Sequence, residues 1–369
     1  MRIRYFTTLQ YPSTFANRTQ VMKMSEAFSN VSDFVLYIDD TRVALPELFQ
    51  LYGVRKPFEI KVLKFTKNKP RAFCAALAYR TVIKENPAET IFYVREGLLA
   101  FFLILMSRRF RNNFFYEMHS FVRHSKFIYK TIFYFAHGII STSESKAEVL
   151  VDSFKVSRDH ILVAPNVLDP ADFENMPSRD NARKVLGISN DKPVVMFTGK
   201  PEALRGIDLI LELAGRMGGK VAFICVGGTQ EEIDALQNRS GFEKVRFVPF
   251  VPHRDVVHYM AAADILIAPQ SARPEFEKVS KYSSPLKILE YMATGIPAIF
   301  SRIPAIEKIV GVDDNFFAKS DSVEDWVRKI ENTMEQYIEV QKKAAVLRTR
   351  ALENTWQNRA KAVLDFIHD

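Results

Sequence analysis

Short apolar runs alternate with longer amphipathic segments along almost the whole chain. Short runs of this kind are typical of buried strands, whereas apolar residues repeated every three or four positions are typical of helices. We predict strands at residues 3–8, 34–38, 90–94, 113–117, 138–142, 161–164, 194–198, 221–226, 245–247, 265–268 and 297–301. Strands that alternate with helices form parallel sheets covered on both faces, so the pattern predicts an α/β chain of the doubly wound, Rossmann-like type.

The amphipathic segments between these strands are the predicted helices. They lie at residues 17–29, 72–85, 98–107, 128–136, 145–154, 207–217, 231–238, 256–263 and 285–294. The segment from residue 39 to residue 71 shows neither pattern clearly, and we predict that it is irregular and basic.

The length of the chain and one polar stretch set the expected domains. A chain of 369 residues with 47% hydrophobic content is long enough for two α/β domains. The strand and helix pattern restarts after the polar residues 175–181, so we expect domains at residues 1–178 and 187–345. Two such domains facing each other are expected to leave a ligand cleft.

One helix with an unusual start stands out, at residues 285–294. Ser284 can cap it, Pro285 suits its first position, and Gly295 stops it. The free N–H groups and the positive end of the helix dipole favour a phosphate there, and Lys287 and Glu290 lie three residues apart on one side. The spacing therefore fits a phosphate and a hydroxylated sugar held by one helix, and it equally fits an ordinary capped helix in a core.

Further candidate site residues follow predicted strands. Lys200 and Arg205 lie in the loop after the first strand of the second domain, and His119 ends a strand of the first domain. Asn17 follows the first strand and begins the helix predicted after it, where an Asn can serve as the cap. The carboxyl ends of parallel strands are where open α/β sheets bind ligands. The alternatives are solvated loop charges, a core histidine and a helix cap without a ligand.

Composition excludes several classes of protein. Cys74 and Cys225 lie in apolar runs without metal-ligand neighbours, so we expect buried reduced thiols in a cytoplasm rather than a disulfide. The N-terminus reads as a strand rather than a signal peptide, and the longest apolar run, 97–106, is shorter than the roughly 20 residues that span a bilayer. No Gly-x-Gly-x-x-Gly or P-loop follows the first strand of either half, so neither a nicotinamide enzyme nor a P-loop ATPase is indicated.

Positive charge is concentrated in the first domain. The chain carries a net charge of +8, but residues 51–135 alone contain 16 Lys and Arg against five Glu, a net of 16 − 5 = +11. Such an excess suits lipid headgroups or nucleic acid, and a solvated surface without a partner is the alternative.

Several segments together resemble a known family. Residues 284–287 (Ser-Pro-Leu-Lys), 290–293 (Glu-Tyr-Met-Ala), Gly295 and Pro297 are similar to the donor-binding segment of retaining, GT-B fold glycosyltransferases of the family 4 type. Similarity to the same family continues at residues 16–23, 116–119, 165–169, 199–200, 205–206 and 355–360. The family usually has Arg and then Lys at the two positions held here by Lys200 and Arg205, and it often has a glutamate eight positions before Glu290, where this chain has Tyr282.

The resemblance implies an enzyme of the hexosyltransferase type that moves a sugar from a nucleotide diphosphate sugar to an acceptor hydroxyl, with retention and without a metal or other cofactor. It implies that residues 346–369 form a helix that crosses back onto the first domain. The residues that it assigns to catalysis are His119, Lys200 and Arg205. Those that it assigns to donor binding are Asn17, Gly199, Ser284, Pro285, Leu286, Lys287 and Glu290.

The expected partners follow from this resemblance and from the charge. They are a nucleotide-sugar donor with uridine or guanosine as its base, a cell-envelope glycan or lipid-linked acceptor, and an anionic membrane surface contacted by residues 98–130. We expect no nucleic acid, and a cytoplasmic protein that is peripheral on the inner face of the membrane. The alternatives are a GT-B fold nucleotide-sugar epimerase, which needs carboxylates as acid and base, and an inactive sugar-nucleotide-binding scaffold.

Overall fold

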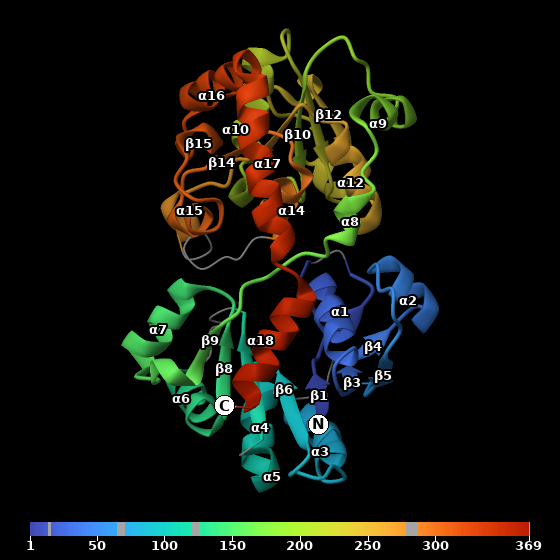
Figure 1. Cartoon of the computed structure of the whole chain (residues 1–369), viewed down its shortest axis with the longest axis vertical. Coiled ribbons are helices and arrows are strands. Elements are labelled where there is room, and N and C mark those ends of the chain that lie inside the picture. Colours follow the sequence, from blue (N-terminus) through green and yellow to red (C-terminus); the bar gives the residue numbers. More distant parts are fainter. Residues whose placement is uncertain (14–15, 65–70, 112, 120–124, 278–285, 369) are drawn as a thin grey trace. The chain divides into compact units, whose positions relative to one another are not determined.

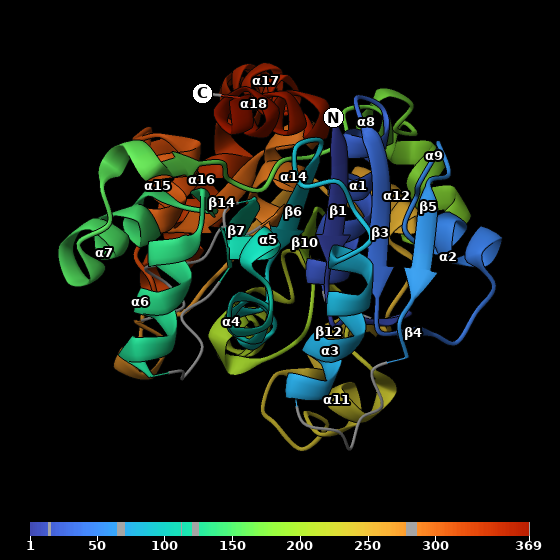
Figure 2. The ribbon, with the colours of Figure 1, turned by 90° about the horizontal axis from the view of Figure 1, so that it is seen from below.

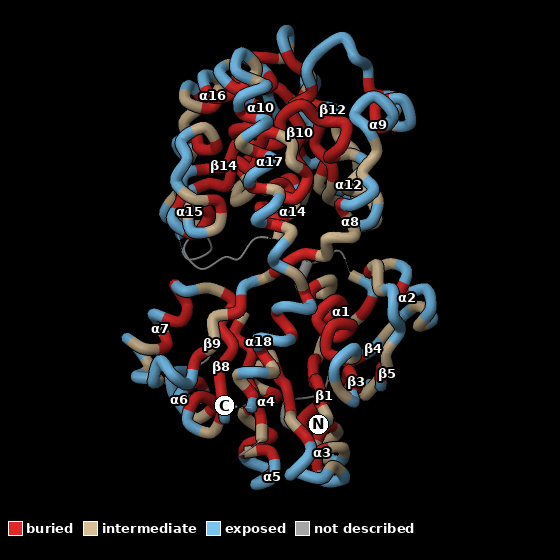
Figure 3. Tube along the Cα trace, in the orientation of Figure 1, coloured by how far each residue is buried: buried red, intermediate tan, exposed pale blue. Residues whose placement is uncertain are grey.

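The apolar runs form the strands of two parallel sheets, and the amphipathic segments form the helices around them (Figure 1). A computed structural model describes residues 1–13, 16–64, 71–111, 113–119, 125–277 and 286–368. Met1–Asn166 and Trp356–Asp369 make up one compact unit, and Val167–Thr355 make up the other. The predicted fold class, α/β with two Rossmann-like sheets, is confirmed. The strands are apolar along most of their length because they are buried on both faces of each sheet (Figure 3).

The first unit is built on a seven-stranded parallel sheet, of which β7, β6, β1, β3 and β5 can be followed from left to right in Figure 2. Its order is β5-β3-β1-β6-β7-β8-β9, so the strand order reverses between β1 and β6. Phe6 pairs with Val94, and Val94 pairs with Tyr116, so the carboxyl ends of β1, β6 and β7 lie next to one another. The bounds are β1 Arg2–Phe6, β3 Asp33–Ile38, β5 Glu59–Val62, β6 Thr90–Val94, β7 Phe114–Met118, β8 Gly138–Ser141 and β9 Ile161–Val163, with β2 Gln10–Tyr11 and β4 Asp40–Thr41 in a separate two-stranded sheet.

Helices cover both faces of this sheet. One face packs against residues of α3, α4, α6 and α7 in a single hydrophobic cluster, whereas α1 packs against the C-terminal helix α18. The bounds are α1 Ala16–Ser29, α2 Leu45–Leu51, α3 Arg71–Val82, α4 Gly97–Met106, α5 Arg108–Arg111, α6 Lys126–Phe135, α7 Glu144–Phe154 and α18 Trp356–His368, with a 3-10 turn at Arg158–His160. The two cysteines are free and buried, as predicted.

The prediction of an irregular segment between residues 39 and 71 was wrong. The described part of this segment contains β4, α2 and β5. Of the residues in β5, only Ile60 is buried, because β5 is the edge strand of the sheet. An edge strand and a seven-residue helix have too few apolar positions to produce a clear period.

The second unit is built on a six-stranded parallel sheet of order β12-β11-β10-β13-β14-β15. Its strand order reverses between β10 and β13. The strands are β10 Val194–Thr198, β11 Ala222–Val226, β12 Val245–Val248, β13 Ile265–Ala268, β14 Ala298–Ser301 and β15 Phe317–Ala318. The helices are α8 Ala171–Glu174, α9 Arg179–Leu186, α10 Ile207–Met217, α11 Gln230–Asp234, α12 His253–Ala261, α14 Leu286–Thr294, α15 Pro304–Val310, α16 Val323–Glu335 and α17 Tyr337–Glu353, with 3-10 turns at Ala203–Arg205, Phe242–Lys244, Pro274–Phe276 and Asp314–Phe316.

The limits of the units differ from the expected domains 1–178, 187–345 and 346–369. Residues 167–178 belong with the second unit, because Leu168 and Phe173 are part of its hydrophobic core. The end of α17 also belongs there, since Leu347 and Ala351 pack into the same core. The return to the first unit begins at Trp356, after a break at Asn354 that separates α17 from α18. No helix among the described residues is long and apolar enough to cross a membrane.

Candidate functional site

The loop after β10 lies at the point where the strand order of the second sheet reverses. Gly199 begins this loop with a φ of +131°, a conformation that favours glycine. Its N–H donates to Val226 O at 2.7 Å, and a Cβ here would lie 2.8 Å from Lys287 Nζ. The loop also touches the one after β13, since a Cβ at Gly206 would lie 1.8 Å from Pro269 O. The backbone of both loops is therefore packed closely where open sheets bind ligands.

Lys287 reaches this point from α14. Its Nζ lies 3.8 Å from the centroid of the Phe197 ring, and among the described residues its Nζ has no ion pair with a carboxylate. Burial, and then the nearby Arg205 guanidinium, hold the pKa of Lys287 well below its usual value, although Glu290, Cys225 and Glu202 oppose this effect. A partly buried ammonium without a carboxylate partner is a feature that an anionic ligand would satisfy.

Glu290 is one turn further along α14 and pairs with a residue that the sequence did not indicate. Its Oε1 lies 2.8 Å from His253 Nε2, at the start of α12. The Glu290 side chain is 16% exposed, so the carboxylate is oriented by His253 and is still accessible. Glu290 therefore pairs with His253, and among the described residues no ion pair joins it to Lys287.

The two loop cations are held by glutamates. Lys200 Nζ lies 2.8 Å from Glu232 Oε1 and 3.8 Å from Glu202 Oε2, and Arg205 Nε lies 3.4 Å from Glu202 Oε1. Glu202 therefore contacts both cations. Arg205 acts on Lys287 electrostatically, whereas no interaction joins Lys200 to Lys287 or to Arg205 among the described residues. The structure thus brings Gly199, Arg205, Lys287 and Glu290 together, with Lys200 beside them.

Three residues predicted to bind the donor, Ser284, Pro285 and Leu286, lie at or just before the first residue of α14 in the sequence. Ser284 and Pro285 lie outside the described residues, as does Tyr282. Leu286 is the first residue of α14 and is partly buried. Leu289, Met292 and Ala293 are buried, in accordance with the amphipathic helix predicted at residues 285–294.

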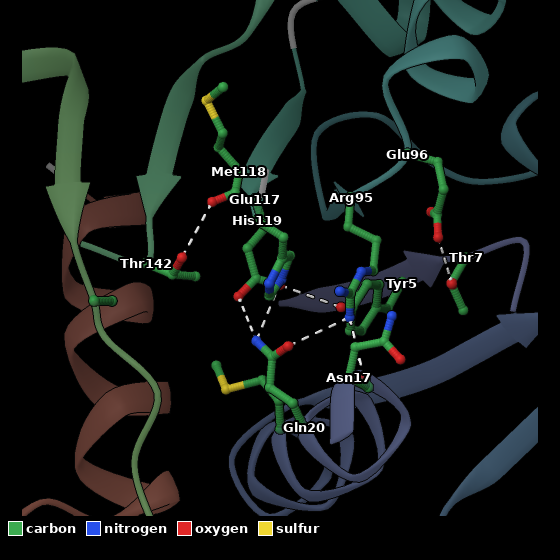
Figure 4. A network of polar contacts seen from close by, with 12 residues as sticks. Tyr5, Thr7, Asn17, Gln20, Arg95, Glu96, Glu117, Met118, His119 and Thr142 are labelled. Carbon is green, nitrogen blue, oxygen red and sulfur yellow. Dashed lines mark hydrogen bonds and ion pairs between the residues drawn. The ribbon is translucent and has the colours of Figure 1, made fainter. Parts of the chain in front are cut away.

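The first unit gathers polar side chains at the carboxyl ends of β1, β6, β7 and β8 (Figure 4). His119 directly follows β7, and its Nε2 lies 3.2 Å from Glu117 Oε2 and 3.3 Å from Gln20 Nε2. Arg95, which follows β6, donates from Nη1 to Gln20 Oε1 and to Asn17 O, both at 3.5 Å. This is again the place where the strand order reverses.

Glu117 is at the centre of this group and is completely buried. Its Oε2 accepts from the Tyr5 hydroxyl at 3.2 Å and lies beside His119, and its Oε1 accepts from Gln20 Nε2 at 3.2 Å and from Arg359 Nη2 at 2.6 Å. An ionised carboxylate has about four lone-pair positions, and these four neighbours fill them. Burial favours the neutral acid, but the surrounding donors and charges hold the pKa of Glu117 well below its usual value.

His119 is neutral around pH 7. Burial, and then the charge of Arg95, lower the pKa of His119 to about 4, although Glu117 opposes this shift. The side chain is 19% exposed, so the histidine is neither a fully enclosed core residue nor an open surface group.

The alternative that Asn17 is only a helix cap was wrong. Helix α1 begins at Ala16, so Asn17 is its second residue, and Asn17 Oδ1 accepts from Arg18 Nη1 at 2.8 Å. The sequence reasoning also gave no role to Gln20, Arg95, Phe197 or His253. Arg95 directly follows the strand predicted at residues 90–94, and this position could have indicated it, but nothing local in the sequence indicated Arg359 or His253 as partners.

The residues that the structure describes contain no group of three or more His, Cys, Asp or Glu that could hold a metal ion. The donor set of the second unit is instead cationic, with Lys200, Arg205 and Lys287. Such a set suits a phosphate rather than a metal ion.

A comparison with known proteins identifies a family match in the second unit. The family described as glycosyl transferases group 1 matches residues 192–336, which lie within the second unit. The D-inositol 3-phosphate glycosyltransferase of Xylanimonas cellulosilytica is 24% identical over 190 residues, 48% of this chain and 43% of that relative. The same-named protein of Mycolicibacterium smegmatis is 24% identical over 239 residues, 62% of this chain and 52% of that relative. The chain thus matches only about half the length of these relatives.

Solved structures resemble the whole chain. The Anabaena protein HepE in complex with UDP superposes with a TM-score of 0.78 at 17% identity, covering 100% of each chain. WaaG, a glycosyltransferase involved in lipopolysaccharide biosynthesis, superposes with a TM-score of 0.68 at 14% identity, covering 99% of each chain. At such identities these structures show only that the fold is similar. The match to the glycosyl transferase family is limited to residues 192–336. Residues 192–336 therefore match the group 1 glycosyltransferase family, and the chain as a whole has a fold similar to that of HepE and WaaG.

Proposed function

We propose that this chain transfers a glycosyl group from a nucleoside diphosphate sugar to an acceptor hydroxyl. The observation that carries the proposal is Lys287, an ammonium without a carboxylate partner among the described residues, at the reversal point of a sheet that matches the group 1 family. A diphosphate is the group that such a position would bind.

The second unit holds the donor in this proposal. Arg205 and Lys287 contact the diphosphate, Lys200 adds a third positive charge, and Glu290 accepts hydrogen bonds from the vicinal hydroxyls of the ribose. His253 orients Glu290 for that task. UDP-glucose is the first donor to test, because HepE, a protein of similar fold, has been solved with UDP and with UDP-glucose.

We propose a retaining reaction without a metal ion. The bond between the sugar C1 and the diphosphate oxygen breaks, the bond between the acceptor oxygen and C1 forms on the same face, and the acceptor proton passes to the departing phosphate oxygen. Cations stabilise the charge that develops on the leaving diphosphate. A double displacement needs a carboxylate nucleophile, and Glu117, the carboxylate beside His119, has its lone-pair positions filled.

The same saturation argues against the epimerase alternative. An epimerase needs an acid and a base that can exchange protons with the sugar. Glu117 is buried and bound by four neighbours, so it is unsuited to that exchange. An inactive binding scaffold is distinguished from a transferase by the experiment below.

We further propose that the acceptor is lipid-linked or part of an envelope glycan, and that the first unit docks on the cytoplasmic leaflet through α4, α5 and α6. Phe127 is 69% exposed and Tyr134 is 81% exposed, and both lie on the face of α6 that also carries Lys130. Leu105, at the end of α4, is 55% exposed and precedes Arg108 and Arg109. Exposed aromatic and apolar side chains beside cations are typical of proteins that rest on anionic lipid. Arg123, part of the expected contact region 98–130, lies outside the described residues.

The test is an incubation with UDP-glucose labelled in the sugar, with a lipid extract or glycan fraction as the acceptor, followed by measurement of free UDP and of the labelled product. Transfer releases UDP and labels the acceptor. An isomerised donor without UDP release identifies an epimerase, and saturable donor binding without either change identifies a scaffold. Each of the last two outcomes would overturn the proposal.

A further inference from the structure

The ring nitrogen Nε2 of His119 has two neighbours that make opposite demands on it. Glu117 Oε2, at 3.2 Å, can only accept a hydrogen bond, whereas Gln20 Nε2, at 3.3 Å, can only donate one. A neutral imidazole has one protonated nitrogen, so Nε2 satisfies one of these neighbours and not both. If Nε2 carries the proton, Nδ1 is a hydrogen-bond acceptor for a ligand, and if Nε2 is unprotonated, Nδ1 is a donor.

The orientation of Gln20 is set by residues on both of its sides. Its Oε1 accepts from Arg95 Nη1 at 3.5 Å, and its Nε2 donates to Glu117 Oε1 at 3.2 Å. The opposite orientation would place the amide oxygen against the carboxylate and the amide nitrogen against the guanidinium. Gln20 therefore already has an acceptor for its amide and does not require one on His119.

Glu117 has no such freedom. Its carboxylate lies 2.6 Å from Arg359 Nη2 and is ionised, so an unprotonated His119 Nε2 would face a negative oxygen with its own lone pair. That contact would be repulsive in a buried site. The proton of His119 therefore lies on Nε2, and Nδ1 carries the lone pair. Among the described residues no contact of Nδ1 is found.

Arg359 prevents the carboxylate from turning away. The side chain of this residue of α18 is 1% exposed, and besides Glu117 it donates to Ala164 O at 3.0 Å and to Pro165 O at 2.9 Å. Its Nη1 also lies 3.0 Å from Met24 Sδ. The guanidinium is thus fixed by the chain after β9 and by α1, and it holds Glu117 in one position.

The charges around His119 keep it neutral. Arg95, Arg359 and the buried ammonium of Lys146 approach this group of residues from the end of β6, from α18 and from α7. Glu117 faces all three cations, and Glu96 also acts on Arg95. Burial, together with the charge of Arg95, lowers the pKa of His119 to about 4. Nδ1 is then a hydrogen-bond acceptor at neutral pH rather than a donor.

We propose that Glu117 is a positioning residue that holds His119 as the Nε2–H tautomer, so that Nδ1 accepts a hydrogen bond from a hydroxyl of the substrate, and that Arg359 of the C-terminal helix holds Glu117 in place. The identification of that ligand as a sugar hydroxyl rests on the proposed function. The tautomer itself does not, since it follows from the contacts alone.

The experiment reads the tautomer by NMR of the full chain labelled with 15N in histidine. The His119 signals are assigned by their loss in His119→Gln, and the long-range couplings of Nδ1 and Nε2 distinguish the two tautomers. We expect the wild type to show the Nε2–H form alone between pH 6 and 8. An Nδ1–H form or a mixture in the wild type would overturn the proposal.

Two variants separate positioning from folding. Glu117→Gln keeps the shape and removes the charge, and we expect both tautomers in it. The double variant Glu117→Leu with Arg359→Met removes both buried charges together, which avoids a lone buried ion, and we expect the same result. Tyr5→Phe is the matched control, because it removes one hydrogen bond to Glu117 and leaves the contact with His119. The Nε2–H form alone in a folded variant without the Glu117 carboxylate would contradict the proposal.

Turnover provides the second measurement. Loss of one neutral hydrogen bond to substrate corresponds to about a tenfold fall in rate, so Glu117→Gln should lower kcat by about this factor, with KM for the donor changed less than about twofold. Unchanged kcat in a variant that shows mixed tautomers would mean that Nδ1 accepts no hydrogen bond from a substrate hydroxyl, and this would overturn the proposal. Absence of any transfer by the wild type contradicts the proposed function instead, and the tautomer of His119 is still read.

Discussion

Lys287 Nζ lies 3.8 Å from the centroid of the Phe197 ring, and Gly199 provides the space that it occupies. The ring face attracts the cation without neutralising it, so the ammonium stays available to an anion. Phe197 and Gly199 belong to β10 and its loop, whereas Lys287 comes from α14. The donor site proposed here therefore depends on backbone packing as much as on charge.

Gly199→Ala tests this relationship. The new Cβ would lie 2.8 Å from Lys287 Nζ, at a φ of +131° that side chains rarely adopt. We expect a fall in thermal stability and at least a tenfold loss of affinity for UDP, measured by calorimetry. Gly215→Ala is the control, because it lies inside α10 with nothing within 4 Å of its Cβ, and it should stabilise the chain by about 0.5–1 kcal/mol. Wild-type affinity in a folded Gly199→Ala protein would contradict the arrangement.

Arg205 and Lys200 should differ in their effect. Arg205→Gln removes a charge beside Lys287 and should cost roughly 1.5–3 kcal/mol at the transition state, calculated from kcat/KM. Lys200 is 48% exposed and is held by Glu232, so Lys200→Gln should cost less. Near-normal kcat/KM in both single variants would show that this loop does not bind the diphosphate of the donor.

Glu290 and His253 should act on the nucleotide rather than on the transferred sugar. Glu290→Gln is expected to weaken binding of UDP and of UDP-glucose by a similar factor, because the proposed contact is to the ribose that both share. His253→Phe should reproduce part of this loss, since it removes the group that orients Glu290 Oε1 at 2.8 Å. Calorimetry measures all four affinities, and unchanged values for both ligands in Glu290→Gln would make the pair purely structural.

The stability of the first unit should depend on pH through His119. Its pKa is about 4 when folded and about 6.5 when unfolded, so the unfolded chain binds more protons between these values. Stability should therefore fall as pH is lowered from 6.5 to 4, by at most about 1.4 kcal/mol per pH unit from this group. Thermal unfolding in this range should show a smaller pH dependence for His119→Gln. An equal dependence in both proteins would mean that His119 titrates normally.

The exposed face of α6 should bind anionic membranes. Sedimentation with vesicles that contain anionic lipid should recover the wild type at low salt, and recovery should fall as salt is raised, since charges are screened beyond about 10 Å at 0.1 M. Replacing Phe127 and Tyr134 by Ser should reduce binding without loss of stability, because both are exposed. Val185→Ser, which changes a residue that is 83% exposed in the second unit, is the control. Equal recovery with anionic and neutral vesicles would favour a soluble acceptor.

The sequence by itself determined the fold class and most elements. Strands buried on both faces and helices with one buried face leave local periods, and these periods predicted β10 to within its observed bounds, 194–198, and α10 at 207–217. Local sequence also indicated two parts of the second site, which are the loop at Gly199 and Lys200 and the helix that carries Lys287 and Glu290. Short edge elements such as β5 and α2 were missed because few of their residues are buried.

Only the tertiary structure decided which side chains meet. Glu117 and Arg359 are 242 positions apart, and Glu290 and His253 are 37 positions apart on different helices, so no local period connects them. The first pair forms because α18 packs against α1 and β8 of the first unit, and the second because α12 and α14 pack against each other. The neutral state of His119 has the same origin, because it depends on burial and on the charge of Arg95, which follows another strand. Local pattern set the elements, whereas topology set the charges and hydrogen bonds of the sites.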